Sequence, residues 1–528
     1  MDYGAVVYYL CFSLIAVTLL LLGLITVAVG IQISRVSDVP ADIPWVGLDN
    51  RRWFPRLRAT LTEVTAGRKR FEEGHEKYST HDLPFILPSL QWPEIILPPS
   101  NASWIASQPE SVLSMHAVFD AATGLEYFGH GPDLDYAHDF AVISRDLTRN
   151  LIKTLPDVLQ EIEASFTDLL ADVGADEWKE VDLMNYLAKT AHRAAAAMFV
   201  GKTLCRDPKY LLLVRSWIGC FGLSSAVFRM LVPQIFQPVV GRLLALPMAV
   251  VKWLAVRRLL PTLRQRLARV RDAQRSEKPA SEDAKPNDLM QWIVDDAARK
   301  RDVHALKPWD LAGKVLLIEL LAYVTTTLTI HRILVDILTH PDATALLLEL
   351  RQEADALFPE LASNPTAVRS MTLADSCIRE TTRINAIAAH GLQRQIVQPG
   401  GVTTPNGLHL PRGAHVATLM PDLFDRETRY DPRRALLHHS ASGKQKMAVD
   451  ISEHSLAFGR GKHACPGRFF AVQNIKLMLG WLVRRYDFQP LSEPIKFTMI
   501  GEVELIPKQT RIKMRRRKME DAEGEESL

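Results

Sequence analysis

The first part of the chain is apolar without interruption by charge. No charged residue lies between Asp2 and Arg35, and the span from Ala5 to Ile33 is almost wholly apolar. About 20 apolar residues suffice to cross a bilayer as a helix, whereas a cleavable signal peptide has a basic start and a shorter apolar run. We therefore predict a retained membrane anchor over residues 1–35. Because Arg35 follows the run, the rest of the chain is expected on the cytoplasmic side, where the sequon at Asn101 would stay unmodified.

A linker with prolines over residues 36–48 precedes a long region in which helical periodicity alternates with short β patterns. Helices are predicted over 52–78 and 137–171, from Asn287, and from Met371; one continuous pattern runs from Trp309 to Thr339 and is ended by Pro341. Short strands are predicted near 85–88, 94–98, 391–397, 407–416, 495–499 and 503–507. These patterns predict a mainly α protein with small β-sheets.

Residues 206–262 are unusually apolar and are interrupted by Pro233, Pro238 and Pro247. Two interpretations stay open, because periodicity alone does not separate exposed apolar patches from buried helices. The segment is either a mobile lid over a substrate channel that dips into the membrane, or a set of ordinary core helices.

Charge and cysteine content narrow the functional class. The 528 residues carry a formal net charge of only +3, which gives no support for nucleic-acid binding. The five cysteines are widely spaced and form no CxxC pair, which argues against a disulfide framework or a zinc site and fits a reducing compartment. Residues 513–528 are basic and then acidic, a pattern that favours a disordered tail.

The sequence of residues 458–471 is Phe-Gly-Arg-Gly-Lys-His-Ala-Cys-Pro-Gly-Arg-Phe-Phe-Ala. It puts Cys465 just before a helical pattern, where the helix dipole favours a thiolate. The stretch resembles the haem loop of the cytochrome P450 family, Phe-x-x-Gly-x-x-x-Cys-x-Gly, at every specified position. The resemblance implies that Cys465 is the thiolate ligand of a haem iron and that Phe458, Gly459 and Gly467 shape its loop. The alternative is that Cys465 is a small buried hydrophobe.

The same resemblance implies roles for two segments upstream. Glu380 and Arg383 match the Glu-x-x-Arg pair that braces the haem loop, and an arginine completes this network in the family. A loose alignment places His439 at that arginine position. On the long helix, Thr326 matches the threonine that hydrogen-bonds dioxygen, while Tyr323 replaces the usual glycine and Thr325 replaces the usual acid, so that a proton relay would run through Thr325, Thr326 and water.

The resemblance also implies donors for the haem propionates. Arg394 and His463 are expected to pair with them, since both side chains suit a carboxylate. The Trp-x-x-x-Arg of the family is not found in this chain, and His138 or Arg145 are suggested as substitutes. Beside the ligand, Arg460, Lys462 and Arg468 are expected to dock an acidic reductase domain.

The resemblance therefore implies a cytochrome P450 fold over residues 49–512, most similar to fungal microsomal members of secondary metabolism. The expected activity is that of a haem-thiolate monooxygenase that oxidises a small apolar metabolite with O2. Electrons come from NADPH through cytochrome P450 reductase, and the protein is expected at the endoplasmic reticulum with one span. Two alternatives stay open: oxidative phenol or aryl coupling, and a reductase-independent haem-thiolate isomerase or dehydratase.

Overall fold

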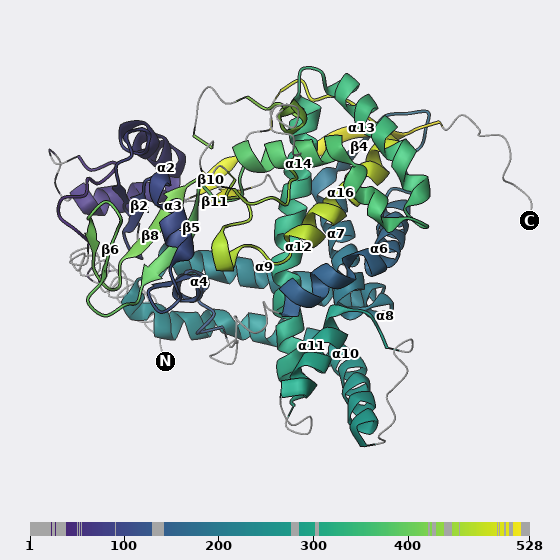
Figure 1. Cartoon of the computed structure of the whole chain (residues 1–528), viewed down its shortest axis with the longest axis horizontal. Coiled ribbons are helices and arrows are strands. Elements are labelled where there is room, and N and C mark those ends of the chain that lie inside the picture. The colour runs from purple at the N-terminus through teal and green to yellow at the C-terminus, as the bar shows by residue number, and fades with distance from the viewer. Residues whose placement is uncertain are drawn as a thin grey trace, which may run out of the picture.

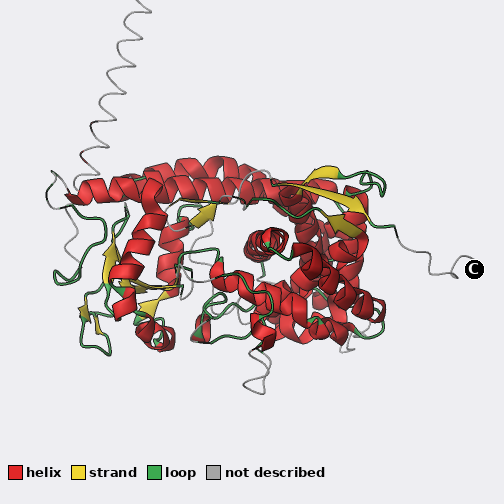
Figure 2. Ribbon diagram, turned by 90° about the horizontal axis from the view of Figure 1, so that it is seen from above, coloured by secondary structure: helices red, strands yellow, loops and turns green. Residues whose placement is uncertain are grey.

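The computed structural model describes residues 39–49, 51, 53, 55–89, 91–128, 142–275, 285–300, 306–420, 423–424, 429–437, 446–452, 455–493, 495, 497–500, 503–505 and 510–518, together with Gly23 and Val27. The predicted anchor lies outside the described residues apart from those two positions, as do His138, His439 and the acidic end of the chain. The described part is mainly helical with small sheets, as predicted, and the strands gather at two margins of the molecule (Figure 2).

The long helix predicted from Trp309 is α12 (Pro308–Thr339), which runs through the middle of the molecule (Figure 1). It starts with Pro308 in its first turn, where the missing N–H costs nothing. It packs against α7 (Leu183–Val200), α10 (Gln237–Arg275), α14 (Thr372–Ile384) and α16 (Arg468–Arg485). Its mid-helix residues are therefore surrounded by the elements that carry the candidate chemistry.

The other helical elements complete the larger lobe and flank the sheet. They are α2 (Pro55–Lys77), η1 (Ser79–His81), η2 (Pro99–Asn101), α3 (Ala102–Ser107), α4 (Met115–Thr123), the π-helical η3 (Ile143–Leu147), α6 (Thr148–Leu169), α8 (Lys202–Cys205), α9 (Pro208–Leu231), η4 (Gln234–Phe236), α11 (Leu289–Lys300), α13 (Ala343–Leu357), η6 (Phe358–Glu360), η7 (Pro365–Ser370) and η8 (Gly461–His463). Most helices share one large core cluster, which extends from Leu125 to Met514, whereas α2 and α3 pack into two smaller clusters beside the sheet.

A five-stranded sheet forms a second lobe with α2 and α3, and Figure 1 shows β2, β5 and β8 beside them. Its order is β1 (Phe85–Leu87), β2 (Glu94–Leu97), β8 (His415–Leu419), β5 (His390–Ile396) and β3 (Leu113–Ser114). Only β2 and β8 pair in parallel. The smaller sheets contain β6 (Val402–Thr403) with β7 (His409–Leu410), β10 (Thr498–Ile500) with β11 (Val503–Leu505), and β4 (Lys179–Asp182) with β9 (Tyr486–Phe488) and β12 (Arg511–Arg516).

Strand β12 corrects the predicted tail, because residues 513–516 are ordered in a sheet. It pairs antiparallel with β4 on one side and with β9 on the other. Ile512 and Met514 are 1% and 2% exposed, while Arg511 and Lys513, which alternate with them, are exposed. Apolar and basic residues thus alternate as in a half-buried strand. The density of basic residues obscured this period of two in the sequence.

Helices α9 and α10 combine features of both interpretations of residues 206–262. One row of α10 is buried in the core and includes Ala255, Leu259 and Leu263. A second apolar row of α10 faces outward and is 59–63% exposed; it consists of Val239, Leu243, Leu246 and Val250, and Ile235 on the preceding η4 extends it. Three helices, α9, α10 and α12, are long and apolar enough to span a membrane by composition alone. Of these three helices, α12 is the central helix of the fold, so α9 and α10 are the ones whose outer faces could contact a membrane.

Candidate active site

The loop before α16 holds Cys465 in a tight turn. The Cys465 N–H donates to the carbonyl of Phe458 at 2.8 Å, and the Gly459 N–H donates to Leu456 at 2.8 Å. Gly459 and Gly461 have φ angles of +67° and +69°, in the left-handed region where glycine is free of Cβ strain. A Cβ at Gly461 would lie 2.4 Å from the carbonyl oxygen of Ala106. The loop therefore packs directly on α3, and this contact fixes the position of the cysteine.

The surroundings of the Cys465 thiol suit a metal ligand. Burial raises the pKa of the thiol, while backbone N–H groups of Gly467 and Arg468 and the charge of Arg468 act in the opposite direction. The Arg468 guanidinium also donates to the Cys465 carbonyl at 2.9 Å. A Cβ built on Gly467 would meet no atom within 4 Å. A soft sulfur donor is thus held in a tight glycine turn, from which it can serve as the ligand of a metal-containing group.

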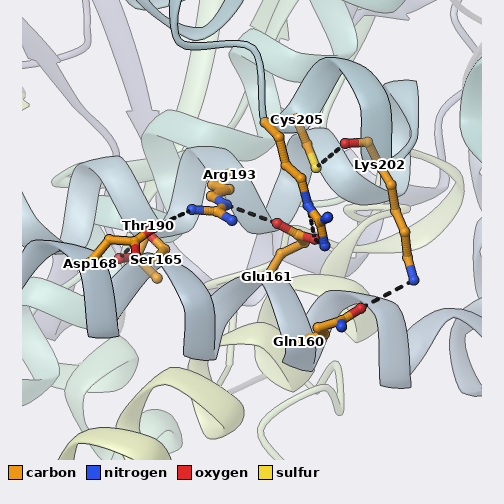
Figure 3. A network of polar contacts seen from close by, with 9 residues as sticks. Gln160, Glu161, Ser165, Asp168, Thr190, Arg193, Lys202 and Cys205 are labelled. Atoms are coloured by element: carbon orange, nitrogen blue, oxygen red, sulfur yellow. Dashed lines mark hydrogen bonds and ion pairs between the residues drawn. The ribbon is translucent and has the colours of Figure 1, made fainter.

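Two other cysteines, Cys205 and Cys377, are buried in the packed core instead. Cys205 lies on α8, beside a polar network around the fully buried Glu161 (Figure 3). Its thiol donates to the Lys202 carbonyl at 3.3 Å, and burial raises its pKa to about 12. Burial likewise raises the pKa of Cys377 to about 12. Both thiols stay protonated and satisfied within the core.

Glu380 and Arg383 form the predicted pair at the end of α14. Glu380 is 2% exposed, and Arg383 donates to both of its oxygens, at 2.7 and 2.9 Å. The Asp431 N–H donates to Glu380 at 3.0 Å, and Arg434 donates through Nε at 3.2 Å. The arginine that completes this network is therefore Arg434. The alignment that put His439 in its place was wrong, because the contact comes earlier in the same loop.

Arg394 and His463, which were both expected to bind haem propionates, lie near the carboxylate of Glu110, a residue that the sequence did not single out. His463 Nε2 lies 3.0 Å from Glu110, and His116 Nδ1 lies 3.3 Å from the other Glu110 oxygen. Arg394 is 3% exposed, and its Nε has no hydrogen-bond partner among the described residues. Burial lowers the pKa of Arg394, while the charge of Glu110 opposes the shift.

Arg145 does not join this cluster. It forms ion pairs with Asp146 at 2.6 Å and with Asp296 at 3.1 Å, and these carboxylates raise its pKa further above the usual value. The suggestion that Arg145 meets a propionate is therefore not supported. His116 supplies a second imidazole instead, from the start of α4. A lone histidine in an amphipathic segment carried no signal that would have identified it.

The threonines of α12 differ in their hydrogen bonds. Thr325 is exposed and donates to the Leu321 carbonyl at 2.9 Å, and Thr327 donates to Tyr323 at 2.9 Å. The Thr326 side chain is 5% exposed and makes no such bond to the helix among the described residues. The Thr326 hydroxyl therefore makes no hydrogen bond to the backbone of α12. Tyr323 turns toward α7, where its ring centroid lies 4.9 Å from that of His192.

The residues present fit a haem group. Cys465 would offer the sulfur ligand from a tight glycine turn. The buried Arg394 Nε, which has no hydrogen-bond partner among the described residues, suits a carboxylate. The fit rests on the chain's own donor set.

Comparison with known proteins agrees with this site. The sequence model of the family described as Cytochrome P450 matches residues 147–514, more than half of the chain. The chain is 29% identical to cytochrome P450 monooxygenase lnaC of Aspergillus flavus, over 83% of this chain and 85% of that protein. It is 28% identical to cytochrome P450 monooxygenase polB of Polytolypa hystricis, over 91% and 94%. It is also 30% identical to cytochrome P450 monooxygenase htyF of Aspergillus rugulosus, over 86% and 69%.

These matches cover the central helix, the Glu380 network and the cysteine loop together. The family expected from the cysteine loop is thereby confirmed, and with it a haem-thiolate cofactor that is supplied with electrons by a reductase. The chain belongs to the cytochrome P450 family and is a monooxygenase-type oxidoreductase of the kind that fungi use in secondary metabolism.

Proposed function

We propose that this protein oxidises a small apolar secondary metabolite at a haem whose iron is bound by the Cys465 thiolate. The observation that carries the proposal is the cysteine loop itself, in which the Cys465 N–H donates to the Phe458 carbonyl and two left-handed glycines, Gly459 and Gly461, shape the turn. When bound, the haem supplies the activation of O2 that no amino-acid side chain provides. The remaining tasks fall to the protein, which must hold the group, orient the substrate, move protons and exclude water.

Several residues would hold the group. Glu380, Arg383 and Arg434 brace the segment before the cysteine loop, and Phe458 and Gly459 shape the loop through the hydrogen bonds at Cys465 and Leu456. Arg394 and His463 would donate to the propionates. Their positions support this role, because His463 lies 3.0 Å from Glu110 and the charge of the same carboxylate acts on the buried Arg394, so that donors from two separate elements lie in one region.

Proton delivery is assigned to Thr326, with Thr325 as its neighbour toward water. The Thr326 hydroxyl is not bonded to its own helix and is therefore available to an oxygen ligand. Thr325 is exposed and bonds to the Leu321 carbonyl. Since a threonine replaces the usual acid, the relay lacks a residue that can hold a proton by itself. We therefore expect ordered water to complete it.

Electron delivery would use the face of the cysteine loop, where Lys462 is exposed. Arg468 is less suited to docking than the sequence implied, because it is bonded to the Cys465 carbonyl and lies over the Phe469 ring. Reversing the charge at Lys462 should slow reduction by the NADPH-dependent reductase and weaken its salt dependence. An unchanged rate and salt dependence would remove Lys462 from the docking site.

The outward apolar row of α10 supports membrane association together with the predicted anchor. A row of large exposed apolar side chains on one helix face is typical of a surface that lies in a lipid interface. The endoplasmic reticulum, with the catalytic domain in the cytoplasm, is the location that fits the anchor, the linker and this row.

Oxidative coupling of an aromatic metabolite is a second candidate. It is favoured by the altered oxygen-side motif, where Tyr323 fills the position of a glycine and packs on His192. A product with twice the substrate mass less two hydrogens, and with no oxygen gained, would decide for coupling. Turnover without NADPH and reductase would instead decide for an isomerase or dehydratase.

The test is expression with a reductase, followed by spectroscopy and product analysis. The reduced protein with carbon monoxide should give the thiolate-type Soret band. Cys465→Ser should lose that band and all turnover. Cys220→Ser, which changes a partly buried cysteine on α9, should keep both. A Cys465→Ser variant that retains the band would refute the assignment.

A further inference from the structure

Glu110 binds two imidazoles that come from different elements. His463 belongs to η8, directly before the cysteine, and His116 lies in the first turn of α4. Their rings stand edge to face, with centroids 5.9 Å apart and an interplanar angle of 90°. The Met115 N–H donates a further hydrogen bond of 3.1 Å to Glu110. Burial works to raise the pKa of Glu110, but the bonds from His116 and His463 hold it far below the usual range.

We propose that Glu110 is a positioning residue for the haem: it orients His116 and His463 so that the opposite edges of their rings meet the propionates. An imidazole that bonds a carboxylate through one nitrogen has its ring plane fixed and turns its other nitrogen in a set direction. In His463 the bonded atom is Nε2, so Nδ1 faces away from Glu110; in His116 the bonded atom is Nδ1, so Nε2 faces away. This inference rests on the proposed function, since it needs haem at Cys465.

Arg394 gives a reason for the presence of Glu110 among side chains that are expected to bind the haem propionates. Its guanidinium is buried, its Nε lacks a hydrogen-bond partner among the described residues, and Glu110 is the charge that stabilises it. A buried cation with no counter-charge is costly. Glu110 therefore holds the two imidazoles in place before haem binds, and its charge also favours the charged form of Arg394.

A metal ion is the competing occupant. The ligand atoms of Glu110, His116 and His463 lie within 4.8 Å of one another, and two histidines with a carboxylate are also a zinc ligand set. The positive charge of Arg394 beside them opposes a second cation. The experiment therefore includes metal analysis of the haem-loaded protein.

The test measures haem loss from the full-length, haem-loaded protein to an excess of apomyoglobin. Glu110→Ala should release haem about tenfold faster, as expected when a charge-assisted hydrogen bond is lost from the donors. The matched control is Glu94→Ala. Glu94 also binds a histidine, His390, at 2.9 Å within the sheet. This control should lower the thermal midpoint but leave the rate of haem loss within twofold of wild type.

A second readout separates positioning from general stability. In a variant that lacks both His116 and His463, adding Glu110→Ala should accelerate haem loss clearly less than tenfold, because the imidazoles are gone and only the effect of the Glu110 charge on Arg394 remains. A full tenfold effect in that background would overturn the proposal, as would an unchanged rate in Glu110→Ala alone or one equivalent of zinc retained by the wild type. If wild-type protein lacks the thiolate-type Soret band, the proposed function fails instead.

Discussion

Gly461 is the position at which the cysteine loop is most sensitive to a single methyl group. Its φ of +69° is in the left-handed region, and a Cβ there would lie 2.4 Å from the Ala106 carbonyl oxygen. The obstructing atom belongs to the backbone of α3 and cannot rotate away. Gly461→Ala therefore has to move either α3 or the loop that carries Cys465.

Gly459 provides the matched control, since it has almost the same φ, +67°, but its nearest neighbour would be the His463 carbonyl at 3.5 Å. A left-handed non-glycine residue costs on the order of 1–2 kcal/mol, and this term is common to both variants. Overpacking adds about 1–3 kcal/mol, and this term belongs to Gly461→Ala alone. We therefore expect Gly461→Ala to be less stable than Gly459→Ala by about 1–3 kcal/mol.

Urea unfolding of the haem-loaded protein, followed by loss of the Soret band, measures this difference. The carbon monoxide complex provides a second readout, because displacement of the loop should lower the fraction with the thiolate-type band in Gly461→Ala only. If the two variants were equally stable and had equal bands, the contact with α3 would not constrain the cysteine, and the reasoning would be refuted.

Three further predictions concern other parts of the molecule. Glu380→Gln should lower haem content in expressed protein by weakening the bonds to Arg383 and Arg434, which breaks a buried ion pair worth about 3–5 kcal/mol; unchanged haem content would contradict a bracing role. Burial raises the pKa of Asp336 to about 6, so the native state binds a proton that the unfolded chain releases above about pH 3.9. This stabilisation is lost as the pH rises through 6. Asp336→Asn should therefore flatten the pH dependence of the unfolding free energy between about pH 3.9 and 6; if the curve of the variant ran parallel to that of the wild type, Asp336 would not be the titrating group. Leu243→Glu, in the outward row of α10, should reduce binding to phosphatidylcholine vesicles when the anchor is removed, whereas equal binding would assign that row to another partner.

The chemistry at the iron could be predicted from the sequence because its signals are local. The cysteine loop, the Glu-x-x-Arg pair and the long helix each lie within one continuous segment. Residue spacing or helical periodicity within that segment therefore predicts each of them. The bounds of α12 and the pairing of Glu380 with Arg383 follow that prediction closely. A helix places residues three apart on one face whatever the rest of the fold does.

Contacts between distant segments were decided by the tertiary structure. Arg434 reaches Glu380, Asp296 on α11 pairs with Arg145, and Glu110 binds His116 and His463 from separate elements. None of these pairs shares a helix face or a strand register, so no period in the sequence reports them. The tertiary structure also decided β12. The basic run was expected to be disordered, but it forms a strand because Ile512 and Met514 are buried in the core. The sequence by itself thus identified the family and the candidate iron ligand, whereas the fold decided which residues surround that cysteine, since side chains remote in sequence meet only when the packed helices and sheets bring them together.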